Sequence, residues 1–184
     1  MKSFNSIKPK QFPNNSTEDT VLEKKETRKF KNYKVQLEHK NLSSPIAVQF
    51  AKNNIHNLLF VSEHSLTFFD LMSDKIITNY PNTKQQVFSA GTIREDGRLI
   101  ITGNNTGGVT VYEPYQKIAI QNYIKPFKLQ VNSIDVIGNK LIACSNDSSL
   151  GYFSLESKDP ISHFKNISSD YLVCSKFINE NLIV

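Results

Sequence analysis

The stretch SAGTIREDGRLIITGNNTGGVTVYE, residues 89–113, decides the fold of this 184-residue chain. It contains three short runs, SAGTI, LIITG and VTVYE, which are rich in the β-branched and apolar residues that strands prefer. The turn formers DG at 96–97 and NNTGG at 104–108 separate these runs. IAIQNY at 118–123 adds a fourth run. The unit therefore predicts four short strands joined by tight turns.

The same unit recurs along the chain at a nearly constant period. An apolar pair opens the second run of each unit, and the first residues of these pairs are 41, 42 and 41 residues apart: Leu58-Leu59, Leu99-Ile100, Leu141-Ile142 and Leu182-Ile183. Four further series keep periods of 41 to 43 residues: Phe50, Ile93, Val136 and Phe177; Phe69, Tyr112 and Phe153; Ile77, Ile120 and Ile161; and Tyr80, Tyr123 and Phe164. Four strands per period of about 40–45 residues are the signature of a propeller blade.

The repeat predicts an all-β chain with blades at about residues 45–82, 83–126 and 127–166 and an incomplete fourth blade at 167–184. Each blade is a small sheet that must stack on its neighbours to bury both faces. A ring needs at least four blades. We therefore expect about three and a half blades of a truncated seven-bladed ring, preceded by a basic, largely disordered leader at residues 1–44.

The units resemble WD repeats. Such repeats end their third strand with an aromatic and an acidic residue, and the equivalent pairs here are Phe69-Asp70, Tyr112-Glu113 and the altered Phe153-Ser154. Asp147 lies three residues before Leu150, where the family's tight-turn Asp belongs. The chain has no Trp and lacks the family's opening Gly-His pair. The family's hydrogen-bonded Asp–His–Ser/Thr–Trp network is thus incomplete, and we expect packing to hold the blades together.

The span from Pro45 to Glu113 is similar to one WD-repeat family in particular, the U3 small nucleolar RNA-associated propeller proteins numbered fifteen in their series, which belong to the UtpA subcomplex. The matching segments are SPIAVQF, NLLFVSEHSLTFFD and above all REDGRLIITG at 94–103. The resemblance implies a non-enzymatic scaffold of the small-subunit processome, in the nucleolus of the nucleus. Its implied partners are other propeller scaffold proteins of that assembly, pre-rRNA and the U3 snoRNP, and its implied role is pre-18S rRNA processing in ribosome biogenesis. The alternative is a WD-repeat protein–protein adaptor in another complex, without an RNA role.

All of the net charge lies in the leader. Residues 1–44 hold ten Lys or Arg and five Asp or Glu, which accounts for the whole formal charge of +5 and leaves the blades neutral. Its basic cluster supplies the candidate RNA or partner contacts: Lys24, Lys25, Arg28, Lys29, Lys31 and Lys34. Basic side chains attract phosphates regardless of sequence. A solvated tail is the competing interpretation, since the first twenty residues are polar enough to predict disorder.

Within the leader, YKVQL at 33–37 alternates apolar and polar residues. We hypothesise that it is a ring-closing strand that pairs with a blade beyond residue 184. A short helix or a mobile linker is the alternative.

The sequence predicts no catalytic, cofactor or metal site and no small-molecule substrate. The four histidines, His39, His56, His64 and His163, show no metal-ligand spacing. We expect His163 to be structural and His56 and His64 to lie in exposed turns. Both cysteines, Cys144 and Cys174, follow apolar residues in expected strands and are expected to be buried thiols. No apolar run approaches the length that spans a bilayer, so no membrane partner is expected.

Overall fold

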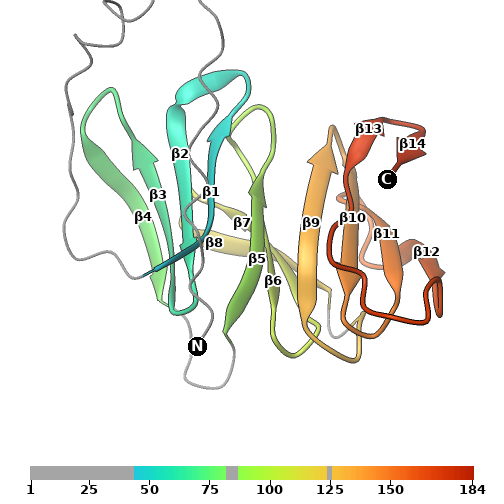
Figure 1. Cartoon of the computed structure of the whole chain (residues 1–184). Helices are drawn as coiled ribbons and strands as arrows, with labels where there is room; N and C mark the ends of the chain where they lie inside the picture. Colours follow the sequence, from blue (N-terminus) through green and yellow to red (C-terminus); the bar gives the residue numbers. More distant parts are fainter. Residues whose placement is uncertain (1–43, 82–86, 124–125) are drawn as a thin grey trace, which may run out of the picture. The chain divides into compact units, whose positions relative to one another are not determined.

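A computed structural model describes residues 44–81, 87–123 and 126–184, and within these ranges every regular element is a β-strand. Three four-stranded antiparallel sheets follow one another along the chain, each a meander whose strands pair in chain order. Figure 1 shows the three sheets arranged in succession from cyan to orange. This is the predicted blade arrangement, so the predicted all-β propeller fold is confirmed.

The strands coincide with the twelve runs of the three complete repeats. The first sheet comprises β1 (Pro45–Ala51), β2 (Asn54–Ser62), β3 (Ser65–Asp70) and β4 (Lys75–Pro81). The second comprises β5 (Phe88–Ile93), β6 (Ile100–Asn104), β7 (Val109–Glu113) and β8 (Ile118–Tyr123). The third comprises β9 (Val131–Ile137), β10 (Lys140–Ser145), β11 (Leu150–Ser154) and β12 (Pro160–Phe164). A two-stranded sheet, β13 (Phe177–Asn179) and β14 (Leu182–Ile183), completes about three and a half blades.

The register corrects one detail of the repeat. Leu58 opposes Phe69 on the neighbouring strand, and Leu141 opposes Phe153 in the same way. In the second sheet, however, Ile100 rather than Leu99 opposes the equivalent aromatic, Tyr112. Leu99 lies just before β6, because the turn after β5 is longer than the corresponding turn of the third sheet. The structural period at this column is therefore displaced by one residue in the second sheet.

The hydrophobic core lies between successive sheets. One cluster joins the first and second sheets: Ala51, Leu59, Val61, Leu66, Phe68, Phe88, Ile93 and Ile100. The other joins the second and third sheets: Ala90, Ile101, Val109, Val111, Tyr123, Phe127, Val131, Ile134, Val136, Leu141, Ala143 and Phe153. Full burial of one such Leu or Phe side chain stabilises the fold by about 1.5–3 kcal/mol. The first strands β1, β5 and β9 also contact one another in sequence, so the sheets converge along these strands.

The outward faces of the first and third sheets lack such cover in the described part of the chain. On β1, Val48 is 55% and Phe50 is 51% exposed, whereas the residues equivalent to Phe50, Ile93 and Val136, are 2% and 6% exposed. On β12, Phe164 is 51% exposed, although its equivalent Tyr123 is 3% exposed. The same positions are therefore buried wherever the structure places a neighbouring sheet against them.

The second and third sheets approach each other closely at Gly103. A Cβ atom at this position would lie 2.6 Å from the Cβ and Cγ1 atoms of Val131 on β9 and 3.1 Å from Cδ1 of Ile134. Both of these side chains are buried and cannot move aside into solvent. Glycine at 103 thus sets the spacing between these two sheets.

We predict that Gly103→Val lowers the free energy of unfolding by about 1–3 kcal/mol, because the added side chain overpacks this interface. Urea unfolding of the 184-residue chain measures the loss. The matched control is Gly138→Asn, where a Cβ would meet nothing within 4 Å and the backbone φ of 54° suits Asn. A loss at Gly138 as large as that at Gly103 would contradict the close-approach explanation.

Candidate functional site

The predicted leader contacts Lys24, Lys25, Arg28, Lys29, Lys31 and Lys34 lie outside the described residues, as does the possible closing strand at 33–37. Their role stays a prediction. What the structure does describe is the set of contacts that joins the blades and shapes the turns at their rims, and these contacts determine which surfaces a partner can reach.

The third-strand aromatics Phe69, Tyr112 and Phe153 occupy the same position on β3, β7 and β11. Two of them pack, with tilted rings, against an aromatic from the preceding sheet. Tyr112 lies 4.7 Å, ring to ring, from Tyr80 on β4, and Phe153 lies 4.9 Å from Tyr123 on β8. Aromatic pairs at such distances add about 0.5–1.5 kcal/mol to their burial. In the second and third sheets, the third-strand aromatic thus forms the contact with the last strand of the preceding blade.

The residues that follow these aromatics cap the turn between the third and fourth strands. Asp70 accepts hydrogen bonds from Met72 N (3.0 Å) and Ser73 Oγ (2.7 Å). The Ser73 hydroxyl and the Met72 N–H together lower the pKa of the Asp70 carboxyl. Glu113 accepts a bond from Gln116 Nε2 at 3.0 Å in the equivalent turn. The side chains of these acidic residues therefore stabilise the turns between the third and fourth strands.

A repeated hydrogen bond between blades accompanies each aromatic pair. The hydroxyl of Tyr80 donates to the carbonyl oxygen of Glu113 at 3.2 Å, and that of Tyr123 donates to the carbonyl oxygen of Ser154 at 2.6 Å. Burial raises the pKa of Tyr80 to about 12, with Tyr112 and Glu113 acting in the same direction. Burial likewise raises the pKa of Tyr123 to about 12, against a lowering effect of Gln121. Both hydroxyls therefore remain donors well above neutral pH.

A second donor lies two residues earlier on each of the same strands. The Thr78 hydroxyl donates to the carbonyl oxygen of Pro114, and the Gln121 amide donates to the carbonyl oxygen of Ser157. β4 and β8 therefore each anchor the next blade through one aromatic contact, one hydrogen bond to the end of its third strand and one to the turn that follows. The sequence showed the Tyr80–Tyr123–Phe164 series, but spacing alone gave no indication of which strand these side chains reach.

Asp147 organises the turn between β10 and β11. Its Oδ2 accepts a hydrogen bond from Lys128 N at 2.7 Å and its Oδ1 accepts one from Ser149 N at 3.1 Å. Burial raises the pKa of Asp147, but the bonds from Lys128, Ser149 and Ser145 outweigh it and leave the pKa below its usual value. The carboxylate thus joins this turn to the loop that enters the third sheet.

Two asparagines take over this role in the second sheet. Asn104 Oδ1 accepts bonds from Thr106 N (3.0 Å) and Gly108 N (2.8 Å), and Asn105 Oδ1 accepts one from Val87 N at 3.1 Å. The sequence identified this segment as a turn but did not predict its capping. Polar side chains at the turns therefore supplement the packing that we expected to hold the blades together.

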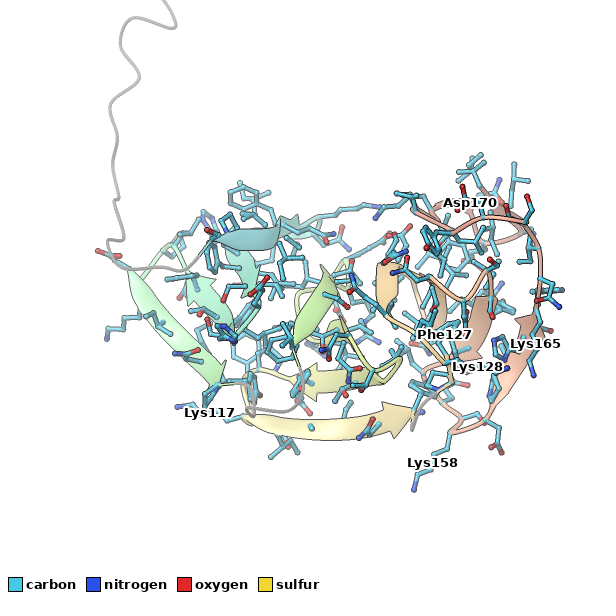
Figure 2. The ribbon with its side chains drawn as sticks, turned by 60° about the horizontal axis from the view of Figure 1, so that its bottom comes forward. Lys117, Phe127, Lys128, Lys158, Lys165 and Asp170 are labelled. Carbon is cyan, nitrogen blue, oxygen red and sulfur yellow. The ribbon has the colours of Figure 1, made fainter. Side chains whose placement is uncertain are left out.

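A hollow of about 260 Å³ opens beside the third sheet. Its lining comprises Pro126, Phe127, Lys128, Asp147, Ser149, His163, Lys165 and Asn166. In Figure 2, Phe127 and Lys128 lie close together before β9, with Lys165 nearby after β12. The Phe127 ring is 2% exposed and meets the His163 ring edge-on at 5.5 Å. The Asp147 carboxylate in this hollow already accepts hydrogen bonds from two backbone N–H groups. The hollow therefore combines one hydrogen-bonded carboxylate with two exposed lysines, Lys128 and Lys165.

His163 occupies a structural position, in line with the sequence interpretation. It opposes Gly151, whereas Asn79 and Asn122 oppose threonines at the equivalent places in the other sheets. Its Nε2 atom is buried without a hydrogen-bond partner. Burial, and then the nearby Lys165, lower the pKa of His163, and Asp147 opposes this effect. The neutral imidazole is thus the form favoured beside the Phe127 ring.

Two expectations about single residues were wrong. His56 is exposed but lies within β2 rather than in a turn, whereas His64 does lie in the turn after β2. Cys144 is fully buried in β10, but Cys174 is exposed and precedes β13. The apolar neighbours Leu172 and Val173 suggested a strand, but the chain at 171–175 belongs to no strand, and backbone pairing begins only at Lys176, which bonds with Val184.

The described residues contain no group of His, Cys, Asp or Glu side chains arranged to hold a metal ion. In the same ranges, no helix is long and apolar enough to cross a bilayer.

No family model matches the sequence. Among curated proteins, the chain is 24% identical over 132 residues to U3 small nucleolar RNA-associated protein 15 of Saccharomyces cerevisiae. The match covers 71% of this chain and 25% of the yeast protein. The chain thus spans about a quarter of the length of this curated relative, to which it is distantly similar.

Solved structures establish the fold. A chain of the mitotic checkpoint complex, a WD40 propeller, superposes with a TM-score of 0.64 at 10% identity, covering 79% of this chain and 52% of that one. The computationally designed protein Ika8 gives 0.66 at 12% identity, covering 77% and 42%. The designed protein Ika4 gives 0.66 at 12% identity, covering 80% and 86%. The described chain has the WD-repeat propeller fold.

We predict that Tyr123→Phe lowers the free energy of unfolding by about 1 kcal/mol, because the ring stack remains while the bond to the Ser154 carbonyl is lost. Urea unfolding near neutral pH measures it. Tyr152→Phe, on the acceptor strand β11 of the third sheet but outside this contact, serves as the control and should change stability by less than about 0.5 kcal/mol. Equal effects of the two substitutions would refute the role of the Tyr123 hydroxyl.

We also predict that His163 makes the fold less stable in mild acid. Because its pKa is lowered in the folded chain, the unfolded chain, with an ordinary His pKa of about 6.5, binds more protons as the pH falls. Its contribution is full above about pH 6.5 and declines below it. His163→Asn, which restores the residue of the other two sheets, should flatten this part of the stability–pH curve. Parallel curves for the two proteins between about pH 7 and pH 5 would exclude the effect.

Proposed function

We propose that this chain is part of a non-enzymatic scaffold in ribosome biogenesis that acts together with U3 small nucleolar RNA. The observation that supports this is the 24% identity over 132 residues to the yeast U3 small nucleolar RNA-associated protein 15. The fold is compatible with it, since propellers offer rigid rims whose loops bind partners. Fold alone does not decide function, so the proposal rests on the sequence similarity.

The finer proposal is a component of the small-subunit processome in the nucleolus. Its partners there would be other propeller scaffold proteins of the UtpA assembly, pre-rRNA and the U3 snoRNP, and its role would be in pre-18S rRNA processing. We further propose that the strands described here belong to a seven-bladed ring. These points follow from the family resemblance of the segments between Pro45 and Glu113.

The charge distribution suggests how RNA would be held. The blades are neutral, whereas the leader contributes the whole net charge of +5. Neutralisation of phosphates by Lys and Arg releases counterions and gives affinity that depends on salt. We therefore propose that the leader residues Lys24, Lys25, Arg28, Lys29, Lys31 and Lys34 make the RNA contact, and that the rims of the blades contact protein partners.

We predict that the tagged protein, purified from its own cells, is enriched in U3 small nucleolar RNA over other small nuclear RNAs, and that nuclease treatment releases it from large nucleolar particles. RNA sequencing and sedimentation measure these two results. Particles that survive nuclease, without U3 enrichment, would instead indicate the alternative function, a protein–protein adaptor without an RNA role.

A pair of charge variants locates the contact. The first replaces the six basic leader residues with Gln. The second is matched in number and replaces six exposed blade lysines: Lys52, Lys75, Lys117, Lys128, Lys158 and Lys165. Lys117 and Lys158 lie at the outer turns in Figure 2. Only the leader variant should lose U3 RNA; the opposite pattern would move the RNA contact to the blades.

A further inference from the structure

Cys144 and Cys174 converge on one serine of the third sheet. Cys144 on β10 directly opposes Ser133 on β9. Directly opposed residues of an antiparallel pair project their side chains on the same face, with Cβ atoms about 4.5–5.5 Å apart. The Ser133 hydroxyl also lies 3.8 Å from Cys174 Sγ and donates to the carbonyl oxygen of Ser175 at 3.2 Å. Both thiols therefore border the same side chain.

The contacts of Cys144 lie on both sides of Cys174. Its Sγ donates to the carbonyl oxygen of Leu172 at 3.5 Å. Burial raises the pKa of the Cys144 thiol; the Ser175 side chain lowers it, and the charge of Cys174 raises it further. The Leu172 carbonyl thus contacts the Cys144 sulfur directly, and Cys174 and Ser175 lie near enough to influence its pKa. The segment at 171–176 thus passes over the buried thiol with the second cysteine in its middle.

The two thiols differ in access to solvent. Cys144 is 0% exposed, whereas Cys174 is exposed. Cys174 belongs to no strand, so its backbone is free of the ladder bonds that would resist a shift to the Cα–Cα separation of a disulfide, about 4.4–6.8 Å. Asn132 Nδ2 donates to the same Leu172 carbonyl at 2.8 Å and so holds the segment near the sheet.

We propose that Cys144 and Cys174 form an oxidation-sensitive pair, a modification site at which a peroxide converts the two thiols into an intrachain disulfide. The inference stands apart from the proposed function, because it uses only the geometry of the third sheet.

The reaction proceeds in two balanced steps. The Cys174 thiolate attacks hydrogen peroxide, so that an S–O bond forms, the O–O bond breaks, and hydroxide takes up the thiol proton as water. Cys174 is then a sulfenic acid, oxidised by two electrons, and the peroxide is reduced. The Cys144 thiolate attacks the Cys174 sulfur, the S–S bond forms, the S–O bond breaks, and the second water leaves with the Cys144 proton. Cys174 reacts first because it is the accessible thiol.

The disulfide would join β10 covalently to the segment that precedes β13. Without it, that segment is held to the sheet by hydrogen bonds from Ser133, Asn132 and Cys144. Oxidation would therefore fix the start of the last, two-stranded sheet against the third blade, and reduction would release it.

Peptide mapping of the oxidised 184-residue chain tests the pair. The reduced protein is treated with hydrogen peroxide, alkylated with iodoacetamide and digested with trypsin without reductant. Cleavage after Lys158 and Lys165 places the two cysteines in separate peptides. We expect these peptides to be joined within one chain in most of the protein, with no disulfide between chains. Joining between two chains through Cys174, or full alkylation of both cysteines, would overturn the proposal.

Two single variants distinguish the order of events. In Cys144→Ser, Cys174 should stop at the sulfenic acid and be trapped by dimedone. In Cys174→Ser, Cys144 should stay reduced, because it is buried. Oxidation of Cys144 at the wild-type rate in Cys174→Ser would refute the two-step pathway. Should a variant fail to fold, the linked peptide in the wild-type chain still decides, and its loss when oxidation is carried out in denaturing urea is the expected result for a pair assembled by the fold.

Discussion

Burial between successive sheets is the constraint on which the rest of the structure depends. A four-stranded sheet has two faces and can bury neither by itself. The core therefore consists of two clusters, one at each junction between neighbouring sheets. Each junction is reinforced in the same way, by an aromatic of the fourth strand that stacks on the third strand of the next sheet and donates its hydroxyl to that strand's last carbonyl.

This repeated junction explains several residue choices that otherwise look unrelated. Tyrosine rather than phenylalanine stands at 80 and 123 because its hydroxyl reaches a backbone acceptor in the next sheet. Glycine stands at 103 because Val131 leaves no room for a Cβ. Where the described residues include no third strand of a following sheet, as beside Phe164, the side chain is half exposed.

The junctions also determine what remains for partners. The packed faces and the first strands are engaged between blades, whereas the turns are stabilised by their own side chains, such as Asp70 and Asp147. Rigid turns on a stacked support suit the binding of other macromolecules. Residues 45–184 carry no net charge, so the proposed attraction to RNA depends on the leader.

The sequence was sufficient for the fold because strand alternation and a 41–43-residue period are properties of the chain itself. It was insufficient for contacts between units. The series of Tyr80 and Tyr123 was visible, but its partners across the junction were not, because stacking between blades leaves no spacing signal. The longer turn after β5 displaced Ile100 by one position, which a fixed period cannot show. Cys174 follows apolar residues yet is exposed, because it lies in a connection over the third sheet.

Residue-resolved hydrogen exchange of the 184-residue chain tests most directly whether junctions between sheets hold the fold. The second sheet is packed on both faces, so its backbone amides in β6 and β7 should exchange most slowly. Amides of β3 in the first sheet and β11 in the third, each packed on one face, should exchange faster, and those of β13 and β14 fastest. Equal protection of the three sheets would contradict the dependence on stacking.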